Sequence, residues 1–310
     1  MDYFYLILGF TVLLISGDLL VKSGVALSTH LRISMLVIGV VFVSLGTSAP
    51  ELVVSIKAAL QDHPDIAIGN VVGSNISNIA LVLGLTALII NIPVNKNSVR
   101  FDWPFMMLAS ILFYLFVLNG ILSFFEGSVF LFLLMVFILW SVKKSRIEMS
   151  RVEHVFAKAR FSVAVSVLLL LISSAGLYFG ATWLVDGAEA IASRYGVSER
   201  VISVTIIAFG TSVPELATSV IAALKKQLDI SIGNIIGSNI FNILGILGVT
   251  SLIKSIPVSI DMRFDVHWML AISVLLILFM LPYGKANLNK WKGFVLLSSY
   301  FLYIILVFQT

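Results

Sequence analysis

Two glutamates stand out because each lies near the middle of an apolar stretch. Glu51 ends the string GTSAPE at 46–51, and Glu215 ends the string GTSVPE at 210–215. Ionisable side chains inside such stretches are rare, and they usually face the protein interior, a partner or an ion path. Carboxylates in that setting can hold cations, so these two residues are the first candidates for chemistry.

Hydroxyl side chains accompany both glutamates at helical spacing. If the surrounding segments are helical, positions i, i+3, i+4, i+7 and i+11 share one narrow face. These positions are Ser44, Thr47, Ser48, Glu51 and Ser55 in the first segment, and Ala208, Thr211, Ser212, Glu215 and Ser219 in the second. The proline before each glutamate should also free the carbonyl of the glycine four residues earlier, because proline has no N–H. Each stripe therefore offers several kinds of oxygen ligand.

A second polar set follows each glutamate. Residues 65–84 read DIAIGNVVGSNISNIALVLG and residues 229–248 read DISIGNIIGSNIFNILGILG, with 13 of 20 positions identical. Each string carries a serine and an asparagine one helical turn apart. All-oxygen ligand sets suit hard cations such as Ca2+, Mg2+ or Na+, and the chain has no cysteine for softer metals. Ca2+ fits better than Mg2+, because it accepts about six to eight flexible oxygen ligands.

Both pairs of strings have the same offset along the chain, since position 46 corresponds to 210 and position 65 to 229. The chain therefore contains two copies of an internal repeat, and each copy covers about five apolar stretches. With an odd number of membrane crossings, the second copy enters the bilayer from the opposite side. Inverted repeats of this kind are typical of secondary transporters. A cation channel is a less favoured alternative, since a channel gains nothing comparable from this symmetry.

The composition indicates an integral membrane protein. Of 310 residues, 59% are hydrophobic and 12% charged, with a mean hydropathy of +1.08, whereas roughly 25% of residues are charged in soluble domains. The apolar stretches predict spans at 3–22, 33–60, 66–92, 102–119, 124–142, 162–189, 198–224, 230–256, 264–283 and 291–309.

We therefore predict an all-α integral membrane fold of ten transmembrane helices, arranged as two inverted five-helix repeats. The N-terminal repeat is 1–142 with its motif at 44–84, and the C-terminal repeat is 161–310 with its motif at 208–248. A basic linker, 143–160, joins them.

The distribution of basic residues predicts the topology. When loops are assigned alternately to the two sides, 15 of the 20 Lys and Arg residues fall on the side of the 143–160 linker. The positive-inside rule then places this linker in the cytoplasm and both termini outside a multi-pass protein of the cell's inner membrane. No Walker, H-E-x-x-H or G-x-S-x-G string appears. We therefore expect neither an ATP-driven pump nor an enzyme.

At GTSAPE, GTSVPE, GNVVGSNISN and GNIIGSNIFN the chain resembles the cation/calcium exchanger superfamily, specifically its prokaryotic sodium/calcium exchanger branch. The resemblance extends over the whole chain. It implies a secondary antiporter that exchanges Na+ for Ca2+ and exports Ca2+ by alternating access. In that mechanism the first and sixth spans slide against the remaining helices.

The resemblance also implies roles for individual residues. The Glu51 and Glu215 carboxylates would bind Ca2+ together with the carbonyls of Thr47 and Thr211. The hydroxyls of Ser48, Ser74, Ser212 and Ser238 would bind Na+, and the carbonyls of Ser44 and Ala208 would assist them. The amides of Asn78 and Asn242 would lie at the central site.

Some family members carry aspartate at the position of Asn242. H+/Ca2+ exchange and K+-dependent Na+/Ca2+ exchange therefore stay open as alternatives. We expect Ca2+ and Na+ as transported ions, membrane lipid around the protein, no nucleic-acid partner, no resident cofactor and a functional monomer.

Overall fold

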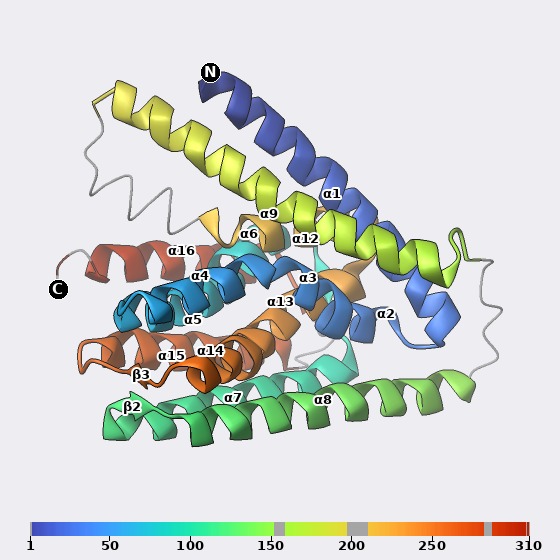
Figure 1. Cartoon of the computed structure of the whole chain (residues 1–310). Coiled ribbons are helices and arrows are strands. Elements are labelled where there is room, and N and C mark those ends of the chain that lie inside the picture. Colours follow the sequence, from blue (N-terminus) through green and yellow to red (C-terminus); the bar gives the residue numbers. More distant parts are fainter. Residues whose placement is uncertain (1, 152–158, 197–209, 282–286, 308, 310) are drawn as a thin grey trace.

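The structure is a computed structural model that describes residues 2–151, 159–196, 210–281, 287–307 and 309. Long helices make up nearly all of this part of the chain (Figure 1). Bulky apolar side chains such as Phe124, Phe125 and Leu139 are exposed on the outside of the helices. This exposure fits a protein surrounded by lipid, because soluble monomers rarely expose large apolar patches.

Eight helices in the described residues are long and apolar enough to cross a membrane. They are α1 (Asp2–Leu31); α5 (Pro64–Ser77), η2 (Asn78–Leu83) and α6 (Gly84–Ile89); η3 (Ser98–Asp102), α7 (Trp103–Phe116) and η4 (Val117–Asn119); α8 (Phe124–Ser150); α9 (Val163–Arg194); α13 (Leu228–Ile240), η6 (Phe241–Leu247) and α14 (Gly248–Ile253); α15 (Met262–Met280); and α16 (Lys290–Val307).

The second expected span is broken. It consists of α2 (Met35–Val37), η1 (Ile38–Val43), α3 (Ser44–Thr47) and α4 (Ala49–Leu60), with a bend of 46° between α3 and α4. The seventh expected span, 198–224, includes α12 (Val213–Leu224), and its first part lies outside the described residues. The membrane-spanning helical fold is confirmed, while the total of ten spans stays a prediction.

Two spans occupy the centre of the molecule. In α5–α6 and α13–α14, 78% and 83% of the most apolar window is buried, against at most 33% in the other six long spans. Both central spans contain a π-helical segment, η2 or η6. These segments hold Asn78 and Asn242, and short π-helical turns within α-helices occur frequently at functional sites.

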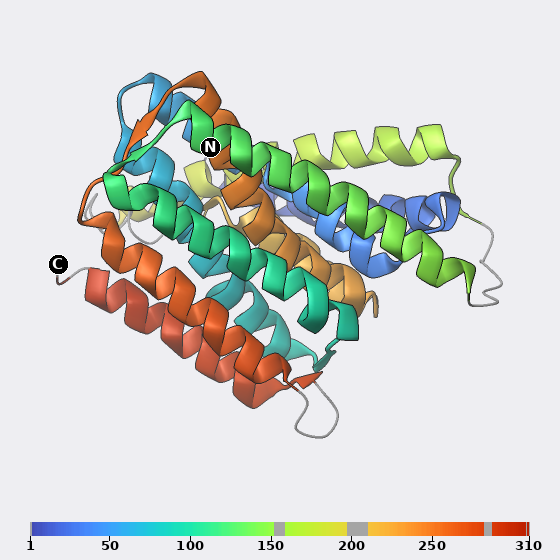
Figure 2. The same cartoon turned by 90° about the horizontal axis from the view of Figure 1, so that it is seen from below.

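The two halves are inverted relative to each other. Strand β1 (Ile92–Pro93) pairs antiparallel with β4 (Asn287–Leu288), and β2 (Ile121–Leu122) pairs with β3 (Ile256–Pro257). Although β1 and β3 start at corresponding positions of the two repeats, the two strand pairs lie at opposite ends of the molecule (Figure 2). An inverted repeat requires this arrangement.

Turns repeat as well. Asp62 and Lys226 both have φ of 61°, and Arg32 and Gly196 have φ of 55° and 77°. The members of each pair occupy corresponding positions of the two repeats, so the left-handed residues recur at the same place in both halves. Such residues are uncommon outside glycine, and their recurrence shows that the halves share turn geometry.

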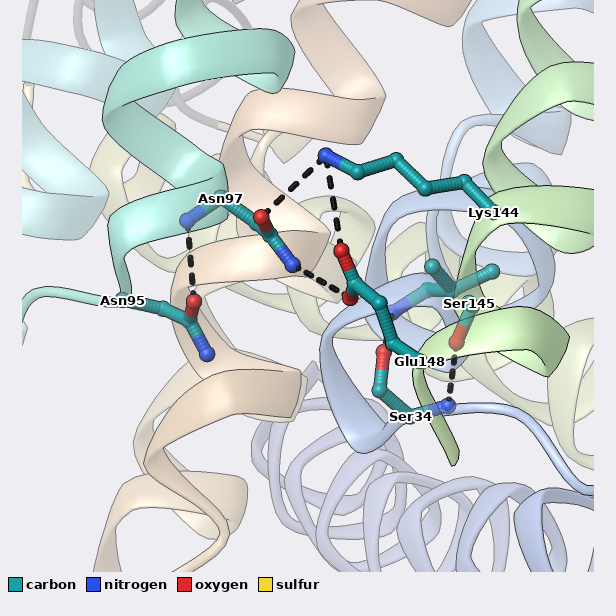
Figure 3. A network of polar contacts seen from close by, with 7 residues as sticks. Ser34, Asn95, Asn97, Lys144, Ser145 and Glu148 are labelled. Carbon is teal, nitrogen blue, oxygen red and sulfur yellow. Dashed lines mark hydrogen bonds and ion pairs between the residues drawn. The ribbon is translucent and has the colours of Figure 1, made fainter. Parts of the chain in front are cut away.

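Helix α8 is longer than expected, because polar contacts hold its last turns against neighbouring loops (Figure 3). Lys144 Nζ lies 3.2 Å from Asn97 Oδ1 and 3.7 Å from a carboxylate oxygen of Glu148, and Asn97 Nδ2 donates to Glu148 at 2.9 Å. Ser145 Oγ accepts the Ser34 N–H at 2.8 Å. The first part of the 143–160 linker is therefore helical, while 152–158 lie outside the described residues.

Candidate functional site

Both glutamates lie in the first turn of a helix. Helix α3 ends at Thr47, Ser48 has φ of −87° and ψ of 9°, and α4 starts at Ala49 with Pro50 in its first turn. Proline is tolerated there because the N–H that it lacks has no intrahelical partner. Ser212 and Pro214 hold the same positions before and in α12. Glu51 and Glu215 thus stand where the positive end of a helix dipole favours a carboxylate.

Glu215, in the second repeat, accepts a hydrogen bond from a residue of the first repeat. Ser48 Oγ donates to Glu215 Oε1 at 3.0 Å, and Ser238 Oγ donates to the same oxygen at 3.4 Å. The Thr47 hydroxyl lies 3.4 Å from Ser238 Oγ. All four side chains are fully buried. Because Ser48 directly precedes helix α4, whose first turn carries Glu51, both carboxylate-bearing turns lie in one region of the core.

Glu51 has a different environment. Neither of its carboxylate oxygens has a hydrogen-bond partner among the described residues, although the side chain is fully buried. The same holds for further buried atoms of the two repeated motifs, namely the hydroxyls of Ser74 and Ser212, both side-chain polar atoms of Asn78, Oδ1 of Asn242 and Oε2 of Glu215. Leaving a buried carboxylate unpaired is costly. Since most of these atoms are oxygens, they are suited to hold a cation.

The two central asparagines differ in their contacts. Asn242 Nδ2 donates to Asn75 Oδ1 at 3.0 Å, and Asn75 Nδ2 donates to the carbonyl of Asn239 at 3.3 Å. These bonds join α5 to α13 and η6. Asn78 makes no such bond within the described residues. Asn75 and Asn239 belong to the repeated strings. Apart from this repetition, nothing in the sequence predicts that they are hydrogen-bonded to each other across the halves.

Four of the predicted ligands are carbonyls, namely those of Ser44, Thr47, Ala208 and Thr211. The Ser44 carbonyl accepts the N–H of Ser48 at 2.9 Å and lies 3.3 Å from the Thr47 hydroxyl, which are contacts within the broken span. Ala208 lies outside the described residues. Thr211 is half-buried and lines a cavity of about 190 Å³ together with Pro50 and Asp186. This cavity reaches the residue next to Glu51, so it is a candidate entrance.

Asparagines outside the predicted ligand set hold the two motif helices in place. Asn70 Nδ2 donates to Ser55 Oγ at 2.9 Å, and at the corresponding positions of the second repeat Asn234 Nδ2 donates to Ser219 Oγ at 3.0 Å. Asn234 Oδ1 also lies 3.1 Å from the Thr47 hydroxyl, which belongs to the other half. The repetition of asparagine and serine at the same spacing in both motifs is the sequence signal for these bonds.

Asn234→Ala is expected to lower the thermal unfolding temperature of the detergent-purified protein. The change removes the amide that donates to the buried Ser219 hydroxyl, and an unsatisfied buried polar group costs about 1–3 kcal/mol. It also removes the 3.1 Å contact of the Thr47 hydroxyl, which keeps longer contacts to Ser44 and Ser238. The matched control is Asn91→Ala, because Asn91 is exposed and its side chain makes no hydrogen bond among the described residues. Equal unfolding temperatures for the two variants would contradict this role of Asn234.

Within the described residues, no three His, Cys, Asp or Glu side chains form one cluster. The carboxylate charge of the site therefore comes from one glutamate of each half. The family model described as sodium/calcium exchanger protein matches residues 1–143 and 165–309. The chain belongs to the sodium/calcium exchanger protein family.

Several proteins resemble the chain over nearly its whole length. Sodium/calcium exchanger MaX1 of Methanosarcina acetivorans is 30% identical, over 99% of this chain and 98% of the relative. An uncharacterized membrane protein of Methanocaldococcus jannaschii is 37% identical, over 97% and 96%. A solved structure of the sodium-calcium exchanger NCX_Mj, soaked with Na+ and Ca2+, has a TM-score of 0.83 and 35% identity, covering 98% of this chain and 97% of that one.

Another match covers a smaller part of the chain. Sodium/potassium/calcium exchanger 1 of Rattus norvegicus is 35% identical over 38% of this chain and 11% of its own length.

Proposed function

We propose that this chain is a secondary antiporter that exports Ca2+ from the cytoplasm in exchange for Na+. The observation that carries the proposal is a buried contact between the two halves. In this contact Glu215 accepts a hydrogen bond from Ser48, which lies three residues before Glu51. Family membership and the similarity to exchangers of known name support it.

Charge gives a reason for coupled exchange. With both glutamates ionised, the empty site carries −2 in a low-dielectric setting, which is expensive to enclose. One Ca2+ neutralises this charge. Three Na+ ions would leave +1, which must be spread over several polar oxygens. The bare protein should therefore resist the occluded crossing, so that Ca2+ moves only against a counter-cation.

We assign the ligands as follows. Ca2+ binds the carboxylates of Glu51 and Glu215 with the carbonyls of Thr47 and Thr211. Na+ binds beside this site, and the breaks before α4 and α12 supply backbone oxygens in addition to side chains. The Na+-site residues are the hydroxyls of Ser48, Ser74, Ser212 and Ser238 and the carbonyls of Ser44 and Ala208, with the amides of Asn78 and Asn242 at the centre.

We also propose a membrane topology and an oligomeric state. The chain acts as a monomer in the inner membrane, without a resident cofactor or enzymatic activity, and its basic 143–160 linker faces the cytoplasm with both termini outside. The concentration of Lys and Arg on the linker side supports this topology.

Reconstituted protein tests the function and its alternatives in one experiment. Proteoliposomes loaded with Na+, with K+, with both or with neither are placed in radioactive Ca2+, and a separate set carries an imposed pH gradient. We expect uptake only with internal Na+. Uptake driven by the pH gradient alone would instead establish H+/Ca2+ exchange, and a requirement for K+ beside Na+ would establish the K+-dependent form.

Ca2+ uptake without any counter-cation would contradict antiport altogether. That result would point to a cation channel, for which single-channel currents are the direct measurement.

A further inference from the structure

A seam between α1 and α12 contains two cavities of different chemistry. The first has a volume of about 350 Å³ and lies where α1 approaches the end of α12. Its lining includes Lys22 on α1, Arg160 before α9 and Lys225 directly after α12, together with apolar residues of α1 such as Val25. It therefore combines a basic rim with an apolar wall.

The basic rim has more positive than negative charge. Lys22 and Lys225 both pair with one carboxylate, Asp18, and Lys22 does so at 2.5 Å. Arg160 has no carboxylate partner among the residues that the structure describes. His30 Nε2 lies 2.7 Å from the carbonyl of Phe161, a contact that fixes the Arg160 segment beside α1. Three cations thus share one anion.

Lys225 is partly buried. Burial lowers the pKa of its ammonium group below the usual value, because the charged form loses water contacts. A bound anion would offset this loss of solvation. The side chain is still 33% exposed, so an anion can reach it from outside the protein.

The second cavity is apolar and lies further along the same seam. It has a volume of about 370 Å³, and its lining consists of aliphatic and aromatic side chains of α1, α6, α9 and α12, including Leu14, Leu216 and Ile221. Leu14 is eight residues from Lys22, about 12 Å along the helix. The distance from the basic rim to the apolar cavity therefore matches a molecule with a charged head and an apolar tail.

We propose that this seam binds an anionic phospholipid, with its phosphate between Lys22, Arg160 and Lys225 and an acyl chain in the apolar cavity. Under the proposed topology the basic rim lies at the cytoplasmic surface, where anionic headgroups bind basic pockets between transmembrane helices. A free phosphate ion could satisfy the rim, but it would leave the apolar cavity without an occupant.

Native mass spectrometry of the detergent-purified protein tests the proposal with defined lipids. The protein is incubated with phosphatidylglycerol or phosphatidylcholine of equal chain length, and retained lipid is counted. The wild type should retain phosphatidylglycerol preferentially. Arg160→Gln should weaken this retention about fivefold, the effect of about 1 kcal/mol for one basic residue. Leu14→Trp, which fills the apolar cavity from a partly exposed position, should weaken retention of the same lipid without a change of charge.

Arg151→Gln is the matched control, because Arg151 is an exposed arginine of the same linker outside the cavity. Equal loss in Arg151→Gln and Arg160→Gln would mean general surface attraction and would overturn the site. Displacement of phosphatidylglycerol by millimolar inorganic phosphate, with no effect of Leu14→Trp, would overturn the lipid in favour of a free anion.

Discussion

Replacing Glu215 with glutamine is expected to reduce Na+-dependent Ca2+ uptake by at least about 100-fold. The change removes one of the two negative charges that would neutralise a divalent cation in the buried site. One positive charge of the cation is then uncompensated, and an uncompensated buried charge costs about 3–5 kcal/mol. The fold should survive, because the glutamine carbonyl oxygen can still accept the hydrogen bond of Ser48. Uptake of radioactive Ca2+ into Na+-loaded proteoliposomes measures the loss.

Glu51→Gln should have the same effect on transport, since the two carboxylates contribute equally to the charge of the site. Asp265→Asn is the matched control. Asp265 also lies in a membrane-spanning helix and accepts a hydrogen bond from Tyr303 at 2.8 Å, which asparagine can accept too. Near-normal uptake in either glutamate variant, or an equal loss in Asp265→Asn, would refute the assignment of the site.

Local structure within each repeat could be predicted because nearly identical strings adopt the same geometry in both halves. Helices α4 and α12 start and end at corresponding positions of the two repeats, and so do α6 and α14. The bond between Asn70 and Ser55 recurs between Asn234 and Ser219. Composition and repeat length were also sufficient for the helical membrane fold and its inversion.

The position of the helix break could not be predicted. Pro50 was expected to disturb the helix of the 33–60 span and to free the carbonyl of Gly46, without a separate helix start. In the structure, α3 ends at Thr47 and Pro50 belongs to the first turn of the next helix. Proline is compatible with a kink or with a new helix start. The choice depends on packing around Ser48, whose hydroxyl meets Glu215 in the other half.

The side-chain contacts between the two halves could not be predicted from the sequence either. The repeat indicated that Thr47 and Asn234 belong to related motifs, but their side-chain contact depends on how the halves dock. The same applies to the pairing of Asn75 with Asn242. Periodicity assigns residues to faces of a helix, and it does not identify the helix that each face meets.

Glycine at position 237 is expected to be essential for this docking. A Cβ atom at Gly237 would overlap the carbonyl oxygen of Val40 and lie 2.6 Å from the Val40 Cα, so backbone would have to move. Gly237→Ala should therefore push α13 away from η1 and displace Ser238, which contacts both Glu215 and Thr47. We expect destabilisation by about 1–3 kcal/mol, as in overpacked cores, measured as a lower thermal unfolding temperature.

Gly245→Ala is the matched control in the same span. A Cβ atom at Gly245 would meet the ring of Phe241 at 3.2 Å, a side-chain contact that a small ring movement relieves. Ca2+ uptake should fall at least about tenfold in Gly237→Ala, because movement of Ser238 disturbs the ligand geometry, and should stay near the wild-type rate in Gly245→Ala. If both variants unfold and transport alike, close approach of α13 to η1 is not what positions the second glutamate.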